Sequence, residues 1–233
     1  MPFYTLFDPM YWLIVGPTMA LAAFASWRVK STFKEFSTVG VRSGMTGAEA
    51  ARAVCQAGGA EVTIEPVQGF LSDHYDPRTR TLRLSPDVFN GRSISAVAVG
   101  AHEAGHALQH KTSYAWLGIR SKLVPVTQIG SNIWIWVFMA GMMLNRPELV
   151  GVAIVLLGGT VLFQLVTLPV EFDASSRAKA VLAETGIVSN EEEKRGVSKV
   201  LGAAAMTYVA GALTALATLA YYVMKYLQQQ NRR

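Results

Sequence analysis

Four uncharged, apolar stretches place the strongest limit on how this chain can fold. They cover residues 11–27, 124–144, 149–170 and 202–224. Each is long enough, or nearly so, for the ~20 residues that a helix needs to cross ~30 Å of hydrocarbon. A chain of 233 residues, 51% apolar and 16% charged, could not bury four such helices on every side in a core of its own. The sequence therefore predicts a mainly α membrane protein with about four transmembrane helices.

The first apolar stretch is predicted to be an uncleaved anchor. Asp8 precedes it and no basic residue does, which is the wrong flank for a secretory signal peptide. Arg28 and Lys30 follow it, as expected at a cytoplasmic flank. Most other basic residues between the spans would share that side, so we expect the region after this anchor to face the cytoplasm from the cell (inner) membrane. Lys225 and the C-terminal arginines oppose this bias, and a final helix that lies in the interface or re-enters would remove the conflict.

Charge and cysteine content exclude other classes of protein. The net charge of +5 comes from basic residues beside the spans, so we attribute it to contact with the lipid bilayer and not to nucleic acid. The single cysteine, Cys55, excludes an internal disulfide framework and a thiolate-rich zinc site.

A motif of two histidines, His102-Glu103-Ala104-Gly105-His106, carries the clearest chemical information. On a helix, residues four apart share a face, so both imidazoles can bind one metal ion. Glu103 lies about 100° around from His102 and can reach a metal-bound water instead of the metal. The alternative is two core histidines, which would need partners for four ring nitrogens. The motif predicts one Zn²⁺ and a hydrolase in which Glu103 is the general base and acid.

A catalytic zinc usually has a third protein ligand. His110 lies on the same face but about 12 Å from His102 along the axis, too far to share the ion. His74 lies in a turn-prone stretch. Glu171 directly follows an apolar span, where a carboxylate is costly without a partner such as zinc. We therefore expect Glu171 to be the third ligand, with a plain interfacial charge as the alternative.

Local patterns predict several shorter elements. Thr46 and Glu49 form a capping-box pattern that opens a helix ending near Gly58, and Ser93 is the expected N-cap of the motif helix. A second capping box is expected to start at Ser189. Alternation predicts strands at 61–65 and 81–84, either as a structural hairpin or as an edge that receives substrate backbone as an added strand.

The chain resembles the bacterial membrane-bound neutral zinc metallopeptidases of the YugP type. The shared features are the motif, a membrane hairpin, the run Glu-Phe-Asp-Ala-Ser-Ser-Arg-Ala at 171–178, and the stretches 72–77 and 82–85. More distantly, the chain is similar to the HtpX-type membrane proteases. The resemblance implies a gluzincin with the zinc ligands His102, His106 and Glu171.

One position departs from the HtpX-type pattern, which has an aspartate four residues after the ligand glutamate to orient a histidine. Here that position is Ser175, so either Asp173 or Ser175 would take the orienting role. A further donor should stabilise the oxyanion, and His74, Tyr75 and Arg177 are candidates. A turn-stabilising role for His74 and Tyr75, and an ion pair between Arg177 and Asp173, are the alternatives.

The predicted organisation has five parts. They are an N-terminal transmembrane anchor (1–27), a small α+β zincin-like cytoplasmic metallopeptidase domain (28–123), a transmembrane hairpin (124–170), a segment with the glutamate ligand (171–200), and a C-terminal transmembrane helix with its tail (201–233).

Polypeptides, including membrane proteins, are the expected substrates, and a membrane partner protein or a homo-oligomer stays open. The second hypothesis is a catalytically silent membrane scaffold with a structural zinc site. An ATP-driven protease is excluded because no Gly-rich phosphate loop occurs. A site-two-type protease is disfavoured because its motif lies inside a span, and here only a short apolar run, 94–101, precedes His102.

Overall fold

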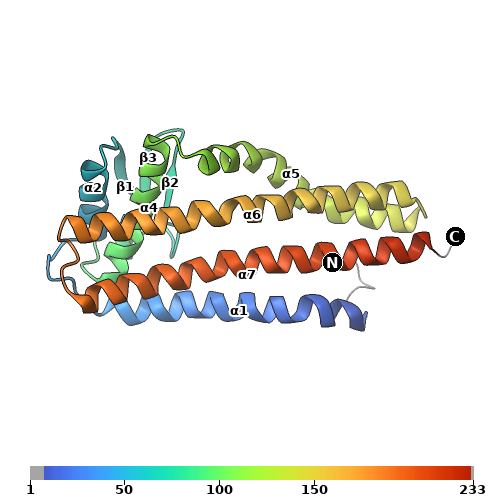
Figure 1. The fold of residues 1–233 in the computed structure, drawn as a ribbon, viewed down its shortest axis with the longest axis horizontal. Coiled ribbons are helices and arrows are strands. Elements are labelled where there is room, and N and C mark those ends of the chain that lie inside the picture. The colour runs from blue at the N-terminus through green and yellow to red at the C-terminus, as the bar shows by residue number, and fades with distance from the viewer. Residues whose placement is uncertain (1–7, 232–233) are drawn as a thin grey trace. The chain divides into compact units, whose positions relative to one another are not determined.

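The fold is a mainly α architecture, and the computed structural model describes it for residues 8–231 (Figure 1). Within these residues, four helices are long and apolar enough to cross a membrane, and each covers one of the predicted stretches, except that the helix of the second stretch ends at Met143, one residue before its predicted end. They are α1 (Pro9–Ser37), α5 (Ala115–Met143), α6 (Pro147–Glu184) and α7 (Glu191–Gln230). The prediction of a mainly α protein with about four such helices is confirmed. Residues 1–7 of the predicted anchor and 232–233 of the predicted tail lie outside the described residues.

Shorter elements lie between α1 and α5. They are α2 (Gly47–Ala57), β1 (Thr63–Pro66), β2 (His74–Asp76), β3 (Thr81–Leu84), α3 (Pro86–Phe89) and α4 (Ile94–Lys111). The chain divides into two compact units. The first holds residues 8–25, 119–168 and 207–231, and the second holds 26–118 and 169–206.

Large aromatic and aliphatic side chains from all four long helices pack together in the first unit. Tyr11, Phe138, Leu157 and Tyr222 are among its buried residues. The ring of Tyr11 meets that of Tyr221 edge-on, with 5.1 Å between centroids. Such T-shaped pairs are favoured by the ring quadrupoles and add to the burial of apolar area.

An ion pair joins the beginning of α1 to the end of α7 within this first unit. Asp8 accepts a hydrogen bond of 2.8 Å from the Tyr221 hydroxyl and lies 2.5 Å from Lys225 Nζ. The start of the first helix and the end of the last therefore lie at one end of the unit. Lys225, one of the basic residues that do not fit the predicted charge bias between the two sides, is paired here with the carboxylate of Asp8.

The second unit contains a three-stranded sheet in the order β1-β3-β2. β1 runs parallel to β3, with Thr63 opposite Thr81, and β2 runs antiparallel to β3, with Tyr75 opposite Leu82. The predicted strands at 61–65 and 81–84 exist at 63–66 and 81–84, but they do not form a hairpin with each other. A parallel pair needs a long crossover, and here that connection contains β2.

Helix caps in the second unit follow the local sequence closely. At α2 the Glu49 amide donates to Thr46 Oγ1 (3.1 Å) and the Thr46 amide donates to Glu49 Oε2 (2.7 Å), which confirms the capping box. Ser93 Oγ accepts from the Ala96 amide and caps α4, as predicted.

The second capping box is displaced by one residue from its predicted start at Ser189. Asn190 Oδ1 accepts from the Glu193 amide at 2.8 Å, while Glu193 Oε2 accepts from the Ser189 amide at 3.0 Å. Asparagine caps as well as serine does, and starting at Asn190 places Glu193 where its carboxylate reaches back to the chain before the helix.

Candidate metal centre

Helix α4 is buried along most of its length because small residues let neighbouring backbones approach it. A Cβ at Gly100 would lie 2.4 Å from the Gly47 carbonyl oxygen, and a Cβ at Gly105 would lie 2.4 Å from that of Ala174. Both distances are shorter than a carbon–oxygen contact allows, so each position requires glycine. The glycine inside the two-histidine motif is thus what allows α4 to lie directly against the part of α6 that follows Glu171.

Three side chains from α4 and α6 converge beside this contact. His102 Nε2 lies 3.2 Å and His106 Nε2 lies 3.6 Å from Glu171 Oε2. One potential ligand atom from each of the three residues lies within 4.8 Å of the others. Glu171 is 2% exposed and His106 is 7% exposed, so the cluster is shielded from bulk water. The structure therefore brings together the three predicted ligands.

The donor set fits a zinc ion. In a tetrahedral site with bonds of about 2.1 Å, two ligand atoms stand about 3.4 Å apart, close to the 3.2 and 3.6 Å between the two imidazoles and the carboxylate. Two histidines and one glutamate are also a known ligand set of catalytic zinc, which keeps a fourth position for water, whereas structural sites usually have four protein ligands. Cys55 is buried in the core and is absent from this cluster.

Each candidate ligand histidine is held at its second ring nitrogen by a side-chain oxygen. His102 Nδ1 lies 3.1 Å from Ser175 Oγ, and His106 Nδ1 lies 3.0 Å from Gln109 Oε1. Contacts of this kind orient a ligand imidazole with its other nitrogen toward the metal. Ser175, one of the two predicted candidates for this role, contacts His102 directly. Gln109 was missed by the sequence reasoning.

Asp173 and Arg177 form an ion pair one helical turn apart. Arg177 Nε donates to Asp173 Oδ2 at 2.6 Å, and the same oxygen accepts from Gln109 Nε2 at 2.8 Å. Arg177 also donates to Thr112 Oγ1 and lies over the Tyr114 ring. The alternative prediction for Arg177, an ion pair with Asp173, is confirmed. Among the described residues, Asp173 reaches a candidate ligand histidine through the Gln109 amide and not directly.

The two remaining histidines lie outside the cluster. His110 occupies the last turn of α4, where its Nδ1 lies 2.8 Å from the Tyr75 hydroxyl on β2. Burial raises the pKa of Tyr75, so its phenol stays protonated at neutral pH and can act as a donor. His74 is exposed on β2, with Nδ1 2.8 Å from the Ser72 carbonyl oxygen. His110 is therefore not among the candidate ligands, as its distance from His102 along the helix predicted.

Glu103 adjoins His102 on α4 and is itself largely buried, at 9% exposure. A carboxylate in such a place loses much of its hydration, so it has to be matched to polar partners. Its position in the chain, next to a candidate ligand and on a buried helix, is the one predicted for a general base.

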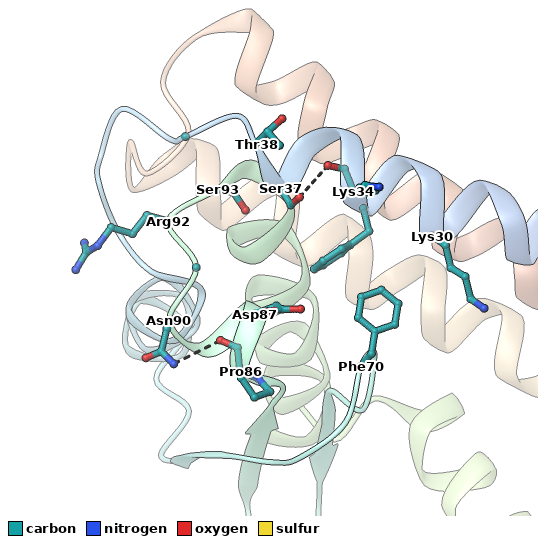
Figure 2. A pocket seen from close by; sticks show the side chains of 13 residues that line it. Lys30, Lys34, Ser37, Thr38, Phe70, Pro86, Asp87, Asn90, Arg92 and Ser93 are labelled. Atoms are coloured by element: carbon teal, nitrogen blue, oxygen red, sulfur yellow. Dashed lines mark hydrogen bonds between the residues drawn. The ribbon is translucent and has the colours of Figure 1, made fainter.

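A separate pocket of about 850 Å³ lies at the end of α1 and the beginning of α4, lined by residues that include Lys30, Phe33, Phe70 and Asp87 (Figure 2). None of the three candidate ligands lines it. Arg92, although at its rim, extends away from Phe70 and lies 3.5 Å from the carboxylate of Glu49. This pocket is distinct from the metal centre.

This chain has four candidate spans and a buried His-His-Glu cluster, and these features together indicate the class of membrane zinc metallopeptidases. Residues 11–227 match the family described as "Putative neutral zinc metallopeptidase", and the chain belongs to that family. It is 49% identical over 210 residues to "Putative membrane protease YugP" of Bacillus subtilis (strain 168), an alignment that covers 90% of this chain and 93% of that protein. No solved structure matches the chain significantly. The resemblance drawn from the motifs is confirmed.

Proposed function

We propose that this protein is a membrane-embedded, zinc-dependent endopeptidase, with His102, His106 and Glu171 as the metal ligands and Glu103 as general base and acid. The observation that carries the proposal is the convergence of two imidazoles and one carboxylate in a buried site, with both imidazole–carboxylate distances close to those of a tetrahedral zinc site. Family membership supports it independently.

The residues of the chain divide the chemistry among them. A zinc ion held by the three ligands would act as a Lewis acid and would lower the pKa of water to about 7. The Glu103 carboxylate takes the proton from the attacking water and returns it to the leaving amine nitrogen. Ser175 and Gln109 keep the two imidazoles oriented throughout.

Polypeptide is the proposed substrate class, and β2 is the proposed place for its backbone. β2 is an edge strand of the sheet, and Tyr75 ties it to the last turn of α4 through His110. An extended peptide added to this edge would form main-chain hydrogen bonds. His74 on β2 is the candidate oxyanion donor through its second ring nitrogen, while the Tyr75 hydroxyl is engaged with His110 and the guanidinium of Arg177 with Asp173 and Thr112. Membrane proteins are proposed among the substrates. We propose that the site faces the cytoplasm, because most lysines and arginines between the spans are on the same side as the site, and such residues favour the cytoplasmic side.

The test compares the wild type with Glu103→Gln, both purified as the full chain in detergent. The variant should keep its zinc content and lose about 10²–10⁴-fold in cleavage of a peptide library, the usual contribution of a general base. Glu184→Gln is the matched control, since Glu184 is exposed on α6 and should leave both quantities unchanged. Equal turnover by the wild type and Glu103→Gln would contradict the proposed mechanism.

A catalytically silent scaffold with a structural zinc site is the competing function. It predicts that zinc-loaded wild type leaves every peptide intact, and that a stable partner complex survives His102→Ala. The three-ligand set disfavours it, because a structural zinc usually has four protein ligands.

A further inference from the structure

We infer that Gln109 is a positioning residue that sets which ring nitrogen of His106 is free to bind the metal, and that it couples this choice to the backbone beside Glu171. The inference rests on the proposed function, since it concerns the same metal centre. Gln109 lies three residues after His106 on α4 and is fully buried, at 0% exposure. An amide so placed has to be satisfied by protein partners, because an unpaired buried polar group destabilises the folded state.

The orientation of the Gln109 amide follows from its neighbours on α6. Nε2 lies 2.7 Å from the Val170 carbonyl oxygen and 2.8 Å from Asp173 Oδ2. A carbonyl oxygen and a carboxylate oxygen can only accept, so the NH₂ group must face them. Arg177 Nε donates to the same Asp173 oxygen at 2.6 Å, so this oxygen is an acceptor for two donors.

The amide orientation in turn dictates the tautomer of His106. With Nε2 turned to α6, Gln109 presents Oε1 to His106 Nδ1 at 3.0 Å. An amide oxygen has no proton to give, so His106 Nδ1 must carry the hydrogen of this bond. In a neutral imidazole Nε2 then bears the free lone pair, and His106 Nε2 is the atom that lies 3.6 Å from Glu171 Oε2 in the metal cluster.

The same amide also restrains the glutamate ligand. Val170, whose carbonyl accepts from Gln109, is the residue directly before Glu171. One side chain therefore bonds to a ligand on α4 and to the backbone adjoining a ligand on α6. Loss of Gln109 should loosen both ligands.

At the other histidine, the partner of Nδ1 imposes no such constraint. His102 Nδ1 faces the hydroxyl of Ser175, and a hydroxyl can donate or accept by rotation. Ser175 can orient the ring of His102 without dictating its tautomer. Removing the Ser175 hydroxyl should therefore weaken zinc binding less than removing the Gln109 amide.

The experiment uses the full chain in detergent and three variants. Gln109→Met keeps the side-chain length without the amide, and Ser175→Ala is the matched control at the other histidine. The double variant Gln109→Glu/Asp173→Asn restores an acceptor opposite His106 Nδ1 and moves the amide donor to position 173, while it gives up the hydrogen bond to the Val170 carbonyl. Zinc affinity is measured by chelator competition, folding by thermal unfolding of the zinc-free protein, and the His106 tautomer by ¹⁵N NMR at pH 8.5, with its signal assigned by loss in His106→Gln.

Gln109→Met should lower zinc affinity about 10–100-fold, the usual effect of removing a partner of a metal ligand. Ser175→Ala should lower zinc affinity less than Gln109→Met does, and the double variant should bind zinc more tightly than Gln109→Met. The zinc-free wild type should show His106 protonated at Nδ1, and Gln109→Met should lose this state. A residue that only fills space would give the opposite order, because the apolar methionine would then be tolerated better than the buried polar pair.

The inference is overturned if zinc-free wild type shows His106 protonated at Nε2, or if Gln109→Met binds zinc within twofold of the wild type. If Gln109→Met does not fold, the wild-type tautomer and the comparison of the double variant with Ser175→Ala decide. Absence of zinc binding by the wild type, with the Nδ1 proton present, would instead contradict the proposed function and leave the role of Gln109 intact.

Discussion

Replacing Gly105 by alanine should force apart the two helices that carry the zinc ligands. The new Cβ would lie 2.4 Å from the Ala174 carbonyl oxygen and 3.0 Å from its carbonyl carbon. The closest ordinary carbon–oxygen contact is about 3.3 Å, so the two backbones must separate by about 0.9 Å. Both atoms that clash with the new Cβ belong to the backbone, so no side-chain rotation relieves the overlap.

The displacement acts directly on the metal centre. Gly105 directly precedes His106, and Ala174 follows Glu171 by three residues on the same helix. Zinc sites hold their ligands within about 0.2 Å of ideal distances, so a separation of about 0.9 Å is several times the tolerance. We expect zinc affinity to fall on the order of 10–100-fold, as when a supporting partner is removed, and the free energy of unfolding to fall by about 1–3 kcal/mol through overpacking.

Chelator competition and thermal unfolding of the zinc-free full chain measure the two quantities. Gly202→Ala is the matched control, because Gly202 is exposed on α7 and a Cβ there meets nothing within 4 Å. Since alanine is the better helix former, this control should be neutral or more stable by up to about 1 kcal/mol. If Gly105→Ala binds zinc as tightly as the wild type and is as stable, the close approach of the two backbones does not require glycine at position 105.

Three further predictions concern single side chains. Glu171→Gln keeps the shape of the ligand but removes its charge. Zinc affinity, measured by chelator competition, should drop by more than the ~10–100-fold expected when a residue that only contacts a ligand is removed. The control His110→Ala should leave zinc affinity unchanged. Thr46→Ala removes the capping box with Glu49 and should lower the unfolding free energy by about 1 kcal/mol, measured by denaturation; no change would mean that the cap contributes nothing. Burial raises the pKa of Cys55 to about 12. At pH 8 about one thiol in 10⁴ is then the reactive thiolate, so mass spectrometry should find Cys55 alkylated only after unfolding, and rapid labelling of the folded chain would contradict its burial.

Local sequence determines much of this architecture. The four long helices follow from uncharged stretches, whose length and apolar character are independent of distant contacts. The caps at Thr46 and Ser93 follow from side chains that bond within three residues of themselves. The pairing of His102 with His106 is equally local, because the helix period alone places them on one face.

The sheet shows where local reasoning fails. β2 has three residues, too few for an alternating pattern to stand out, and its pairing with β3 depends on the crossover between β1 and β3. Parallel pairing of distant strands is decided by the packing of the whole unit, while the sequence near each strand favours no particular partner.

Gln109 shows the same limit at the metal centre. Its role depends on Val170 and Asp173, more than 60 residues away along the chain. One signal was available, since an amide three residues after His106 falls on the buried side of a helix, where it needs partners. Only the structure identifies those partners.

Zinc-edge anomalous diffraction from crystals of the zinc-loaded full chain tests the central claim most directly. The account predicts one strong peak about 2.1 Å from His102 Nε2, His106 Nε2 and a carboxylate oxygen of Glu171. A zinc ion bound at other residues, or a peak that includes the two histidines and excludes Glu171, would contradict it.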